Sequence, residues 1–257
     1  MIQLSERLQT VANYVQEGSK VADIGSDHAL LPVYLVQSQK INFAIAGEVN
    51  EGPLQAAITQ VKQANLEASI APRKGDGLAV IQAGEVNTIT ICGMGGALMR
   101  DILEEGKVNG KLEGVTQLIL QPNIGEDAVR YWLADNDFVI VDETILEEDG
   151  KIYEVIHAHK SEHAKEINSQ LYDPSKLPIF LPDEIKVILL YRMGPFLTLE
   201  GNDVWRKKWT LEIEKLKMRL KSLEQSNSTQ ALLKKHSSQQ EIKMINEVLT
   251  WQSMDKH

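Results

Sequence analysis

Residues 20–32, Lys-Val-Ala-Asp-Ile-Gly-Ser-Asp-His-Ala-Leu-Leu-Pro, decide the fold that we predict for this chain. The apolar run that begins at Val21 ends abruptly at Gly25, and a second apolar segment begins near Ala29. This pattern is typical of a buried strand that turns sharply into a helix. A glycine there permits a positive φ or a close approach of the backbone to another group. The N–H groups of the helix would then favour a polar or anionic ligand, although such turns also occur as plain connections.

The bulk composition indicates an ordinary soluble protein. The 257 residues are 43% hydrophobic, and Cys92 is the single cysteine, so no internal disulfide can form. A chain without disulfides is typical of a reducing compartment. No apolar run approaches the ~18 residues that a membrane span requires, and the first residues lack the features of a signal peptide. We therefore expect a cytoplasmic protein.

The net charge of −9 is unevenly distributed along the chain. Residues 1–160 contain 12 Lys and Arg against 23 Asp and Glu, whereas residues 201–257 contain 11 against 7. An acidic body with a basic tail suggests a polyanionic partner. A solvated, lysine-rich helix would explain the tail equally well on charge alone.

Residues 1–160 predict one α/β domain. An amphipathic helix over 3–16 precedes strands that we predict at 20–25, 42–48, 69–71, 87–92 and 116–121, with helical segments between them. Two further strands, 138–146 and 151–159, flank a hairpin signal at 148–150. The alternation predicts a mostly parallel, seven-stranded sheet with helices on both faces.

Residues 161–257 predict a separate helical domain. Residues 161–182 are polar and contain three prolines, and a helix is expected over 183–192. A heptad-like apolar stripe follows, at Trp205, Trp209, Ile213, Leu216, Leu220 and Leu223. A polar break at 227–229 separates it from a second stripe at Ile242, Ile245 and Leu249. Two helices with a short connection predict an antiparallel hairpin of the coiled-coil kind.

Polar and glycine-rich residues follow five of the predicted strands. In open α/β sheets, ligands bind beyond the carboxyl ends of the strands, at the topological switch point. The residues at these ends are Gly25 to His28, Glu48, Asp76, Gly93 to Gly96 and Gln121 to Asn123. Five such ends together indicate a ligand site more strongly than any one of them.

The first turn does not fit a dinucleotide. The Gly-x-Gly-x-x-Gly pattern would place glycines where this chain has Asp27 and Leu30, and the Asp27 carboxylate would repel a pyrophosphate. Glu48, at the end of the second strand, can accept from both ribose hydroxyls. Asp76 is suited to accept from an adenine amino group. A ligand with ribose and adenine but no phosphate fits these residues, and S-adenosylmethionine is such a ligand.

Several short motifs together resemble the bacterial tRNA (adenine-N1)-methyltransferases of the TrmK family. They are Leu4-Ser-x-Arg-Leu8, Asp23-Ile-Gly-Ser-Asp-His28 with Pro32, Gly47-Glu48, Gly75-Asp-Gly77, Cys92-Gly-Met-Gly-Gly96, Gln121-Pro-Asn123, Tyr153-Glu154 and Gly194-Pro195. The resemblance implies a Rossmann-like class I fold and methylation of the adenine at position 22 of tRNA. One departure is Leu30, because the family usually has a tyrosine there.

The resemblance and the strand-end placement together assign roles to individual residues. The expected cofactor-binding residues are Asp23, Gly25, Ser26, Glu48, Val49, Asn50, Gly75, Asp76, Gly77, Gly93, Met94 and Gly95. The expected catalytic residues are Asp27, His28 and Asn123. Asp27 and His28 could instead bind the cofactor, and His28 could merely cap a helix.

The expected reaction is a direct in-line transfer. Adenine N1 has an in-plane lone pair, so holding it in line with the activated methyl group supplies much of the rate without a covalent nucleophile. The Gly93 to Gly96 segment has no acid, amide or aromatic group to meet the base, so backbone carbonyls or Asn123 are expected to do so. Cys92 is interpreted as a buried strand residue. His157, His159 and His163 lack cysteine or acidic partners, so we predict no metal site.

The basic tail is expected to bind tRNA phosphates. The assigned substrate contacts are Arg7 near the N-terminus and Arg206, Lys207, Lys208, Lys215 and Arg219 in the tail. The alternative for the tail is a dimerising coiled coil, although we expect a monomer. A methyltransferase for another RNA or a small molecule, and a non-catalytic RNA-binding protein, are the alternative functions.

Overall fold

The computed structural model describes residues 2–223 and 228–254, and the chain folds into two compact units, Met1–Asn168 and Ser169–His257. The division falls within helix α6 (Ala164–Leu171), after the boundary at residue 160 that the sequence suggested. Among the described helices, none is both long and apolar enough to cross a membrane.

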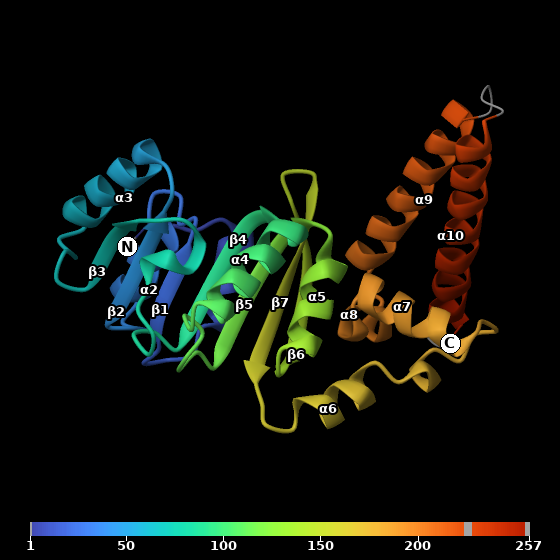
Figure 1. Ribbon diagram of the computed structural model, residues 1–257. Coiled ribbons are helices and arrows are strands. Elements are labelled where there is room, and N and C mark those ends of the chain that lie inside the picture. Colours follow the sequence, from blue (N-terminus) through green and yellow to red (C-terminus); the bar gives the residue numbers. More distant parts are fainter. Residues whose placement is uncertain (1, 224–227, 255–257) are drawn as a thin grey trace. The chain divides into compact units, whose positions relative to one another are not determined.

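The first unit is built on a seven-stranded sheet in the order β3-β2-β1-β4-β5-β7-β6 (Figure 1). The strands are β1 (Lys20–Ile24), β2 (Phe43–Glu48), β3 (Ile70–Lys74), β4 (Thr88–Gly95), β5 (Gln117–Ile124), β6 (Phe138–Glu148) and β7 (Lys151–Lys160). Strands β1 to β5 pair in parallel, whereas β7 runs antiparallel to both β5 and β6. This confirms the mostly parallel sheet and the hairpin expected from the sequence.

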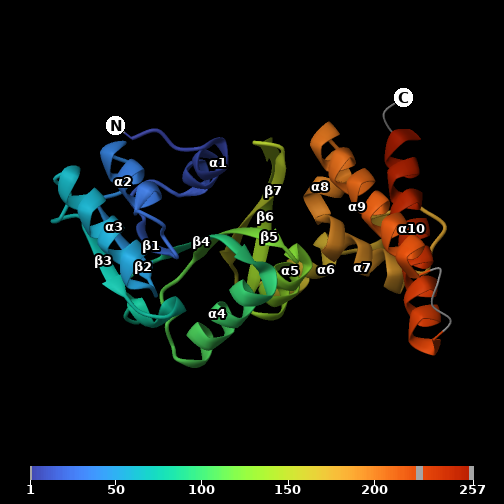
Figure 2. The ribbon, with the colours of Figure 1, turned by 90° about the horizontal axis from the view of Figure 1, so that it is seen from above.

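Helices cover both faces of this sheet. They are α1 (Glu6–Tyr14), α2 (Leu30–Gln37), α3 (Glu51–Gln63), α4 (Gly96–Val108) and α5 (Glu126–Asp135), with the short 3₁₀ helix η1 (Gly77–Val80) after β3. Val11 of α1, Leu31 of α2 and Ala57 of α3 belong to one buried apolar cluster with Val21 of β1. Figure 2 shows α1 and α2 on one side of the sheet and α4 on the other.

A buried ion cluster holds α5 against the antiparallel strands. The Arg130 guanidinium donates to Glu143 Oε1 of β6 at 2.7 Å and to Glu154 Oε2 of β7 at 2.6 Å. All three side chains are fully buried, so each charge depends on the others for compensation. Nothing in the sequence pattern predicted this cluster, because its members are separated along the chain.

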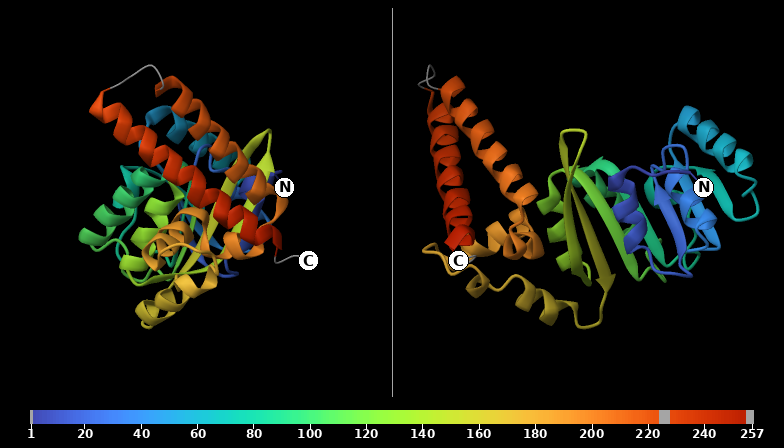
Figure 3. Two further views of the ribbon diagram at one scale, coloured as in Figure 1. Left: turned by 90° about the vertical axis from the view of Figure 1, so that its right-hand side faces the viewer. Right: turned by 180° about the vertical axis from the view of Figure 1, so that it is seen from behind.

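The second unit is helical. After a 3₁₀ turn at Pro174–Lys176 it contains α7 (Asp183–Met193), α8 (Pro195–Glu200), α9 (Asp203–Leu223) and α10 (Thr229–Met254). Helices α9 and α10 pack side by side, which confirms a helical hairpin (Figure 3). The predicted break at 227–229 begins at Asn227, which lies outside the described residues.

In the predicted stripe of α9, Trp205, Trp209, Ile213 and Leu216 are buried, and Leu220 and Leu223 are half-buried. In the predicted stripe of α10, Ile245 is buried, and Ile242 and Leu249 are half-buried. Val248 and Gln252 are buried as well, and the sequence did not predict them. Gln252 enters the interior because its amide donates to the carbonyl oxygen of Glu200 at 3.0 Å. A hydrophobicity pattern cannot predict that a polar side chain occupies an interior position.

Several elements differ from the sequence prediction. Helix α6 was not predicted because it lies in a polar segment. Helix α8 was not predicted because it begins at Pro195, a residue that usually indicates a break, although the first position of a helix tolerates proline. Strands β3, β4 and β5 each continue beyond the expected end, through Lys74, Gly95 and Ile124. These extensions carry two of the polar segments into the sheet itself.

Candidate functional site

The turn after β1 is held by the Asp23 carboxylate. Its two oxygens accept from Ser26 Oγ and Thr90 Oγ1, each at 2.6 Å. Burial is the main cause that raises the pKa of Asp23 to about 6, and these two hydrogen bonds oppose the shift. The Gly25 N–H donates to the Gly47 carbonyl oxygen at 2.9 Å, which joins the turn to the end of β2.

Gly25 is required at this turn by its backbone conformation. Its φ is +69°, in the left-handed region, and a Cβ there would lie 2.4 Å from the Met94 methyl group. The residue therefore supports a close approach of β4 to the turn, as the sequence suggested for this glycine.

Residues 27–29 form a strained segment. Asp27, His28 and Ala29 have φ values of 40°, 68° and 55°, a conformation that side-chain-bearing residues rarely adopt. The Asp27 N–H donates to Glu48 Oε1 at 2.6 Å, which helps to hold the segment. The side chains of Asp27 and His28 are both exposed, with Oδ1 and Nε2 3.6 Å apart. Such strain is concentrated at functional sites, and it places both side chains beside the strand ends.

Glu48 ends β2 as a buried carboxylate, with only 6% of its surface exposed. Since one oxygen accepts from Asp27, the same side chain joins the turn after β1 to the end of β2. The neighbouring Val49 is 52% exposed, and Asn50 occupies the N-cap position of α3 without a side-chain capping hydrogen bond. A large exposed apolar side chain beside a buried carboxylate suits a ligand with an apolar ring and hydroxyl groups.

The segment after β3 brings Asp76 to the same edge. The Gly75 N–H donates to the Glu48 carbonyl oxygen at 2.9 Å. A Cβ at Gly75 would lie 2.8 Å from Val80 Cγ1, so the backbone is tightly packed there. Asp76 itself is exposed, and Gly77 has a φ of +47°.

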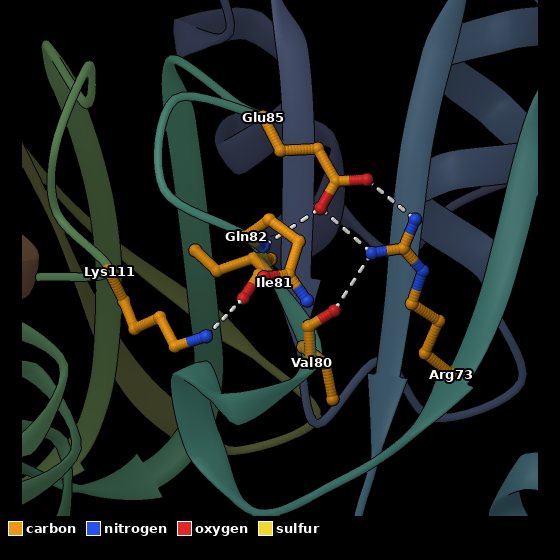
Figure 4. Close-up of polar contacts among 6 residues, drawn as sticks. All are labelled: Arg73, Val80, Ile81, Gln82, Glu85 and Lys111. Carbon is orange, nitrogen blue, oxygen red and sulfur yellow. Dashed lines mark hydrogen bonds and ion pairs between the residues drawn. The ribbon is translucent and has the colours of Figure 1, made fainter. Parts of the chain in front are cut away.

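An ionic brace fixes the loop that follows Asp76 (Figure 4). The Arg73 guanidinium makes two hydrogen bonds to the Glu85 carboxylate, at 2.6 and 2.8 Å, and a third to the Val80 carbonyl oxygen at 3.0 Å. These contacts hold the pKa of Glu85 below its usual range. Lys111 Nζ donates to the Ile81 carbonyl oxygen at 2.8 Å. These contacts therefore fix the end of η1, and with it the turn at Asp76.

A bulge interrupts the pairing of β4 with β5. Cys92 pairs with Gln121 and Met94 with Pro122, so Gly93 lies at a register shift without a partner on β5, and its φ is +78°. A second shift follows between Met94 and Gly95. Bulges of this kind are common beside functional sites because they redirect the chain.

Gln121 and Asn123 replace the missing ladder contacts at the bulge. The Gly93 N–H donates to Gln121 Oε1 at 3.1 Å, and Asn123 Nδ2 donates to the Gly93 carbonyl oxygen at 2.7 Å. Close packing continues at Gly96, where a Cβ would lie 1.9 Å from the Gly125 carbonyl oxygen. The segment with Gly93, Met94 and Gly95 thus lies beside Asn123, as the sequence suggested.

Arg7 reaches this cluster from α1. Its Nη1 donates to Gln121 Oε1 at 2.5 Å, and its guanidinium carbon lies 5.3 Å from the centre of the Tyr153 ring. The sequence predicted that Arg7 contacts tRNA, but not that it contacts Gln121, because the two residues are 114 positions apart. Its binding to tRNA stays a prediction.

The basic residues of α9 lie in the second unit. Lys207, Lys215 and Arg219 are exposed, and Lys215 Nζ lies 3.3 Å from Glu212. Lys208 Nζ lies 5.5 Å from the centre of the Trp209 ring. Arg206 instead contacts α10, where it binds Gln252 and donates to Ser253 Oγ at 2.9 Å. Three of the five predicted tail contacts are therefore exposed cations, whereas Arg206 lies within the hairpin packing.

His157 and His159 lie apart from the strand-end cluster, whereas Cys92 pairs with Gln121 within it. His157 Nε2 is 2.9 Å from His159 Nε2 and 2.7 Å from Gln117 Nε2, at the opposite end of β5, and burial with the neighbouring His159 lowers the pKa of His157 to about 4. Within residues 2–223 and 228–254, no three metal-binding side chains come together. Burial raises the pKa of the Cys92 thiol, which leaves it a poor nucleophile.

Comparison with known proteins places this arrangement in one family. The sequence model of the TrmK family, described as tRNA (adenine(22)-N(1))-methyltransferase, matches residues 21–247. The tRNA (adenine(22)-N(1))-methyltransferase of Bacillus subtilis strain 168 is 44% identical over 229 residues, which cover 89% of each chain.

Solved structures agree with this match. The crystal structure of the B. subtilis M1A22 tRNA methyltransferase TrmK is similar with a TM-score of 0.84 and 41% identity, over 97% of this chain and 100% of that one. A Streptococcus pneumoniae protein crystallised in complex with S-adenosyl-L-methionine is similar with a TM-score of 0.78 and 40% identity, over 96% and 100% of the two chains.

Proposed function

The chain belongs to the TrmK family of tRNA (adenine(22)-N(1))-methyltransferases, and we propose that its strand-end cluster binds the cofactor and the target adenine. The protein methylates N1 of adenine 22 in tRNA with S-adenosylmethionine as methyl donor. The observation that supports the placement of this reaction most strongly is the Glu48 carboxylate, which is buried at the end of β2 and tied to the strained turn after β1.

The proposed cofactor site extends over the ends of β1 to β4. Glu48 accepts from the ribose hydroxyls with the oxygen that is not bonded to Asp27, while Asp76 accepts from the adenine amino group. Val49 and Asn50 border the ribose and adenine. Gly75 and Gly77 let the turn on either side of Asp76 pack closely against Val80 and Ile102.

The methionine portion is assigned to the centre of the sheet. Asp23 and Ser26 fix the turn there, and Gly25 lets the backbone approach the ligand. Gly93, Met94 and Gly95 border the same position from β4.

The catalytic step requires positioning rather than a nucleophile from the protein. S-adenosylmethionine supplies a methyl group on a sulfonium centre, and neutral adenine N1 supplies the electron pair that attacks it. The protein holds the base in line with the methyl group. Asp27 accepts from the exocyclic amine as positive charge spreads through the methylated ring, and Asn123 contacts the same edge of the base. His28 borders Asp27 on the exposed side of the turn.

The second unit is proposed to bind tRNA. Lys207, Lys215 and Arg219 present an exposed positive charge on α9, and Lys208 and Arg206 are adjacent to it. Because α10 covers the apolar stripe of α9 within the same chain, that stripe is not available for a coiled-coil dimer, which supports a monomer. A tRNA substrate also supports a cytoplasmic location.

Two conservative variants separate the proposed roles. Glu48→Gln should raise the Kd for S-adenosylmethionine by about 10-fold or more, because it replaces a charged acceptor of ribose hydroxyls. Asp27→Asn should lower kcat by about 10-fold or more with little change in cofactor Kd, because its acceptor is used mainly as charge develops. Calorimetric titration and steady-state methylation of tRNA measure the two quantities.

A matched control is Glu51→Gln, since Glu51 is an exposed carboxylate in the first turn of α3 near the same strand end. This variant should have the same Kd for S-adenosylmethionine and the same kcat as the original protein. Equal losses of kcat and cofactor affinity in Asp27→Asn would rule out its separate catalytic role. An unchanged cofactor Kd in Glu48→Gln would rule out the ribose contact.

A further inference from the structure

Gln121 is a buried side chain whose amide is fully used in hydrogen bonding. Its residue has no exposed surface. Oε1 accepts from Arg7 Nη1 at 2.5 Å and from the Gly93 N–H at 3.1 Å, while Nε2 donates to the Pro122 carbonyl oxygen at 3.0 Å and to Asn123 Oδ1 at 3.2 Å. The Gln121 amide therefore uses both its donors and both acceptor positions.

These contacts connect the two segments that face the proposed methyl-acceptor site. Gln121 holds the N–H of Gly93, and Asn123 holds the carbonyl oxygen of the same residue at 2.7 Å. Because the bulge leaves Gly93 without a pairing partner on β5, these two side chains take the place of the backbone ladder. The position of the glycine-rich segment thus depends on the two amides.

Arg7 and Gly93 together set the orientation of these amides. A guanidinium and a backbone N–H can only donate, so both must face Oε1 of Gln121 and not the NH₂ group. Nε2 of Gln121 then faces Asn123, which fixes Oδ1 as the acceptor and leaves Nδ2 to donate to Gly93. Asn123 is exposed, and its Oδ1 retains a second lone pair, the group that can accept from the exocyclic amine of an adenine.

We propose that Arg7 and Gln121 are positioning residues, which together fix the orientation of the Asn123 amide toward the methyl-acceptor adenine. We call this chain of hydrogen bonds the relay. It leads from Arg7 of α1 through Gln121 of β5 to Asn123 and the bulge in β4, and neither Arg7 nor Gln121 touches the base. The proposal rests on the proposed function, because it acts through Asn123.

Gln121→Glu tests the relay most sharply. The carboxylate still accepts from Arg7 and from Gly93, but it cannot donate to Asn123, and its charge repels Oδ1. We expect kcat for tRNA methylation to fall roughly 10- to 100-fold, as a displaced catalytic group typically causes. The Kd for S-adenosylmethionine and the KM for tRNA should each change by less than about three-fold, because neither partner is contacted directly.

Arg7 variants provide an independent readout. Arg7→Lys retains a donor that faces Oε1 and should keep most of kcat. Arg7→Met should lower kcat, but by less than Gln121→Glu does, because the Gly93 N–H still faces Oε1. The Arg7→Met/Gln121→Met double variant should have a kcat similar to that of Gln121→Met alone, since residues of one network are non-additive.

Gln117→Glu is the matched control. Gln117 is an equally buried glutamine of the same strand, and it donates to the Tyr14 carbonyl oxygen of α1 at 2.8 Å, but at the other end of β5. Gln117→Glu should lower Tm by at least as much as Gln121→Glu while kcat of the folded protein is retained. If the two variants lose kcat in proportion to Tm, Gln121 has a structural role only and the relay is wrong.

Asn123→Ala distinguishes the relay from the proposed function. Full kcat in Asn123→Ala would overturn the assigned role of Asn123 and the relay with it. A loss in Asn123→Ala together with an unchanged kcat in Gln121→Glu would overturn the relay alone.

Discussion

At the scale of single residues, the site contains buried carboxylates, and burial makes the ionised form of a carboxylate less stable than it is in water. Asp23 is the clearest example, because burial raises its pKa while Ser26 and Thr90 stabilise the ionised form. The nearby Glu48 carboxylate adds to the rise, and the Arg7 guanidinium opposes it. An acid held in this way gives a rigid turn and reduces the stability of the fold at neutral pH.

The pKa of Asp23 predicts a pH dependence of stability. With a folded-state pKa of about 6 against an ordinary 3.8, the folded protein binds the proton more tightly than the unfolded chain. The favourable contribution is complete below about pH 4 and is lost as pH rises through about 6, by about 3 kcal/mol.

Asp23→Asn should remove this dependence. The free energy of unfolding of the variant minus that of the original protein should increase by about 3 kcal/mol from pH 4 to pH 7, because only the original protein loses stability as pH rises. Urea denaturation at four pH values in that range measures the difference. If the free energies of unfolding of the two proteins change with pH in the same way, Asp23 does not titrate as described.

At the scale of elements, sequence periodicity predicted the strands well, since each is a buried apolar run with polar residues after it. It did not predict the β4 bulge or the three left-handed residues from Asp27 to Ala29, because both depend on contacts with other strands. The Gln121 contacts with Arg7 and Gly93 were missed for the same reason. Spacing along the chain contains no information about which distant side chains meet.

The Arg130 cluster gives an element-scale prediction. Arg130→Met should lower the free energy of unfolding by about 3–5 kcal/mol, because it leaves Glu143 and Glu154 buried without their shared counter-ion. Arg100→Met is a suitable control, since Arg100 pairs with Asp101 on the surface and should contribute less than about 1 kcal/mol. Denaturant titration measures both, and similar changes in the two variants would contradict this account of α5.

At the scale of the whole molecule, charge is divided between an acidic sheet domain and a basic helical hairpin. The sequence predicted both the division and the hairpin, because composition and heptad spacing are properties of long segments. It could not predict that Arg206 is used within the hairpin, since that depends on the packing of α9 against α10.

Charge reversal on α9 tests the role of the second unit. Lys215→Glu/Arg219→Glu should raise the KM for tRNA several-fold and make binding less dependent on salt, by about one unit of log–log slope per lost phosphate contact. The Kd for S-adenosylmethionine should not change. Lys62→Glu, an exposed lysine of α3, serves as a control. An unchanged KM together with a change in oligomeric state would indicate a dimer interface instead.

The central claim is tested most directly by locating the transferred methyl group. The protein is incubated with methyl-labelled S-adenosylmethionine and unmodified bacterial tRNA, and the tRNA is then digested and its nucleosides are identified. The account predicts label in 1-methyladenosine, and none in a matched tRNA with guanine at position 22. Label in another nucleoside, or transfer that persists without adenine 22, would contradict it.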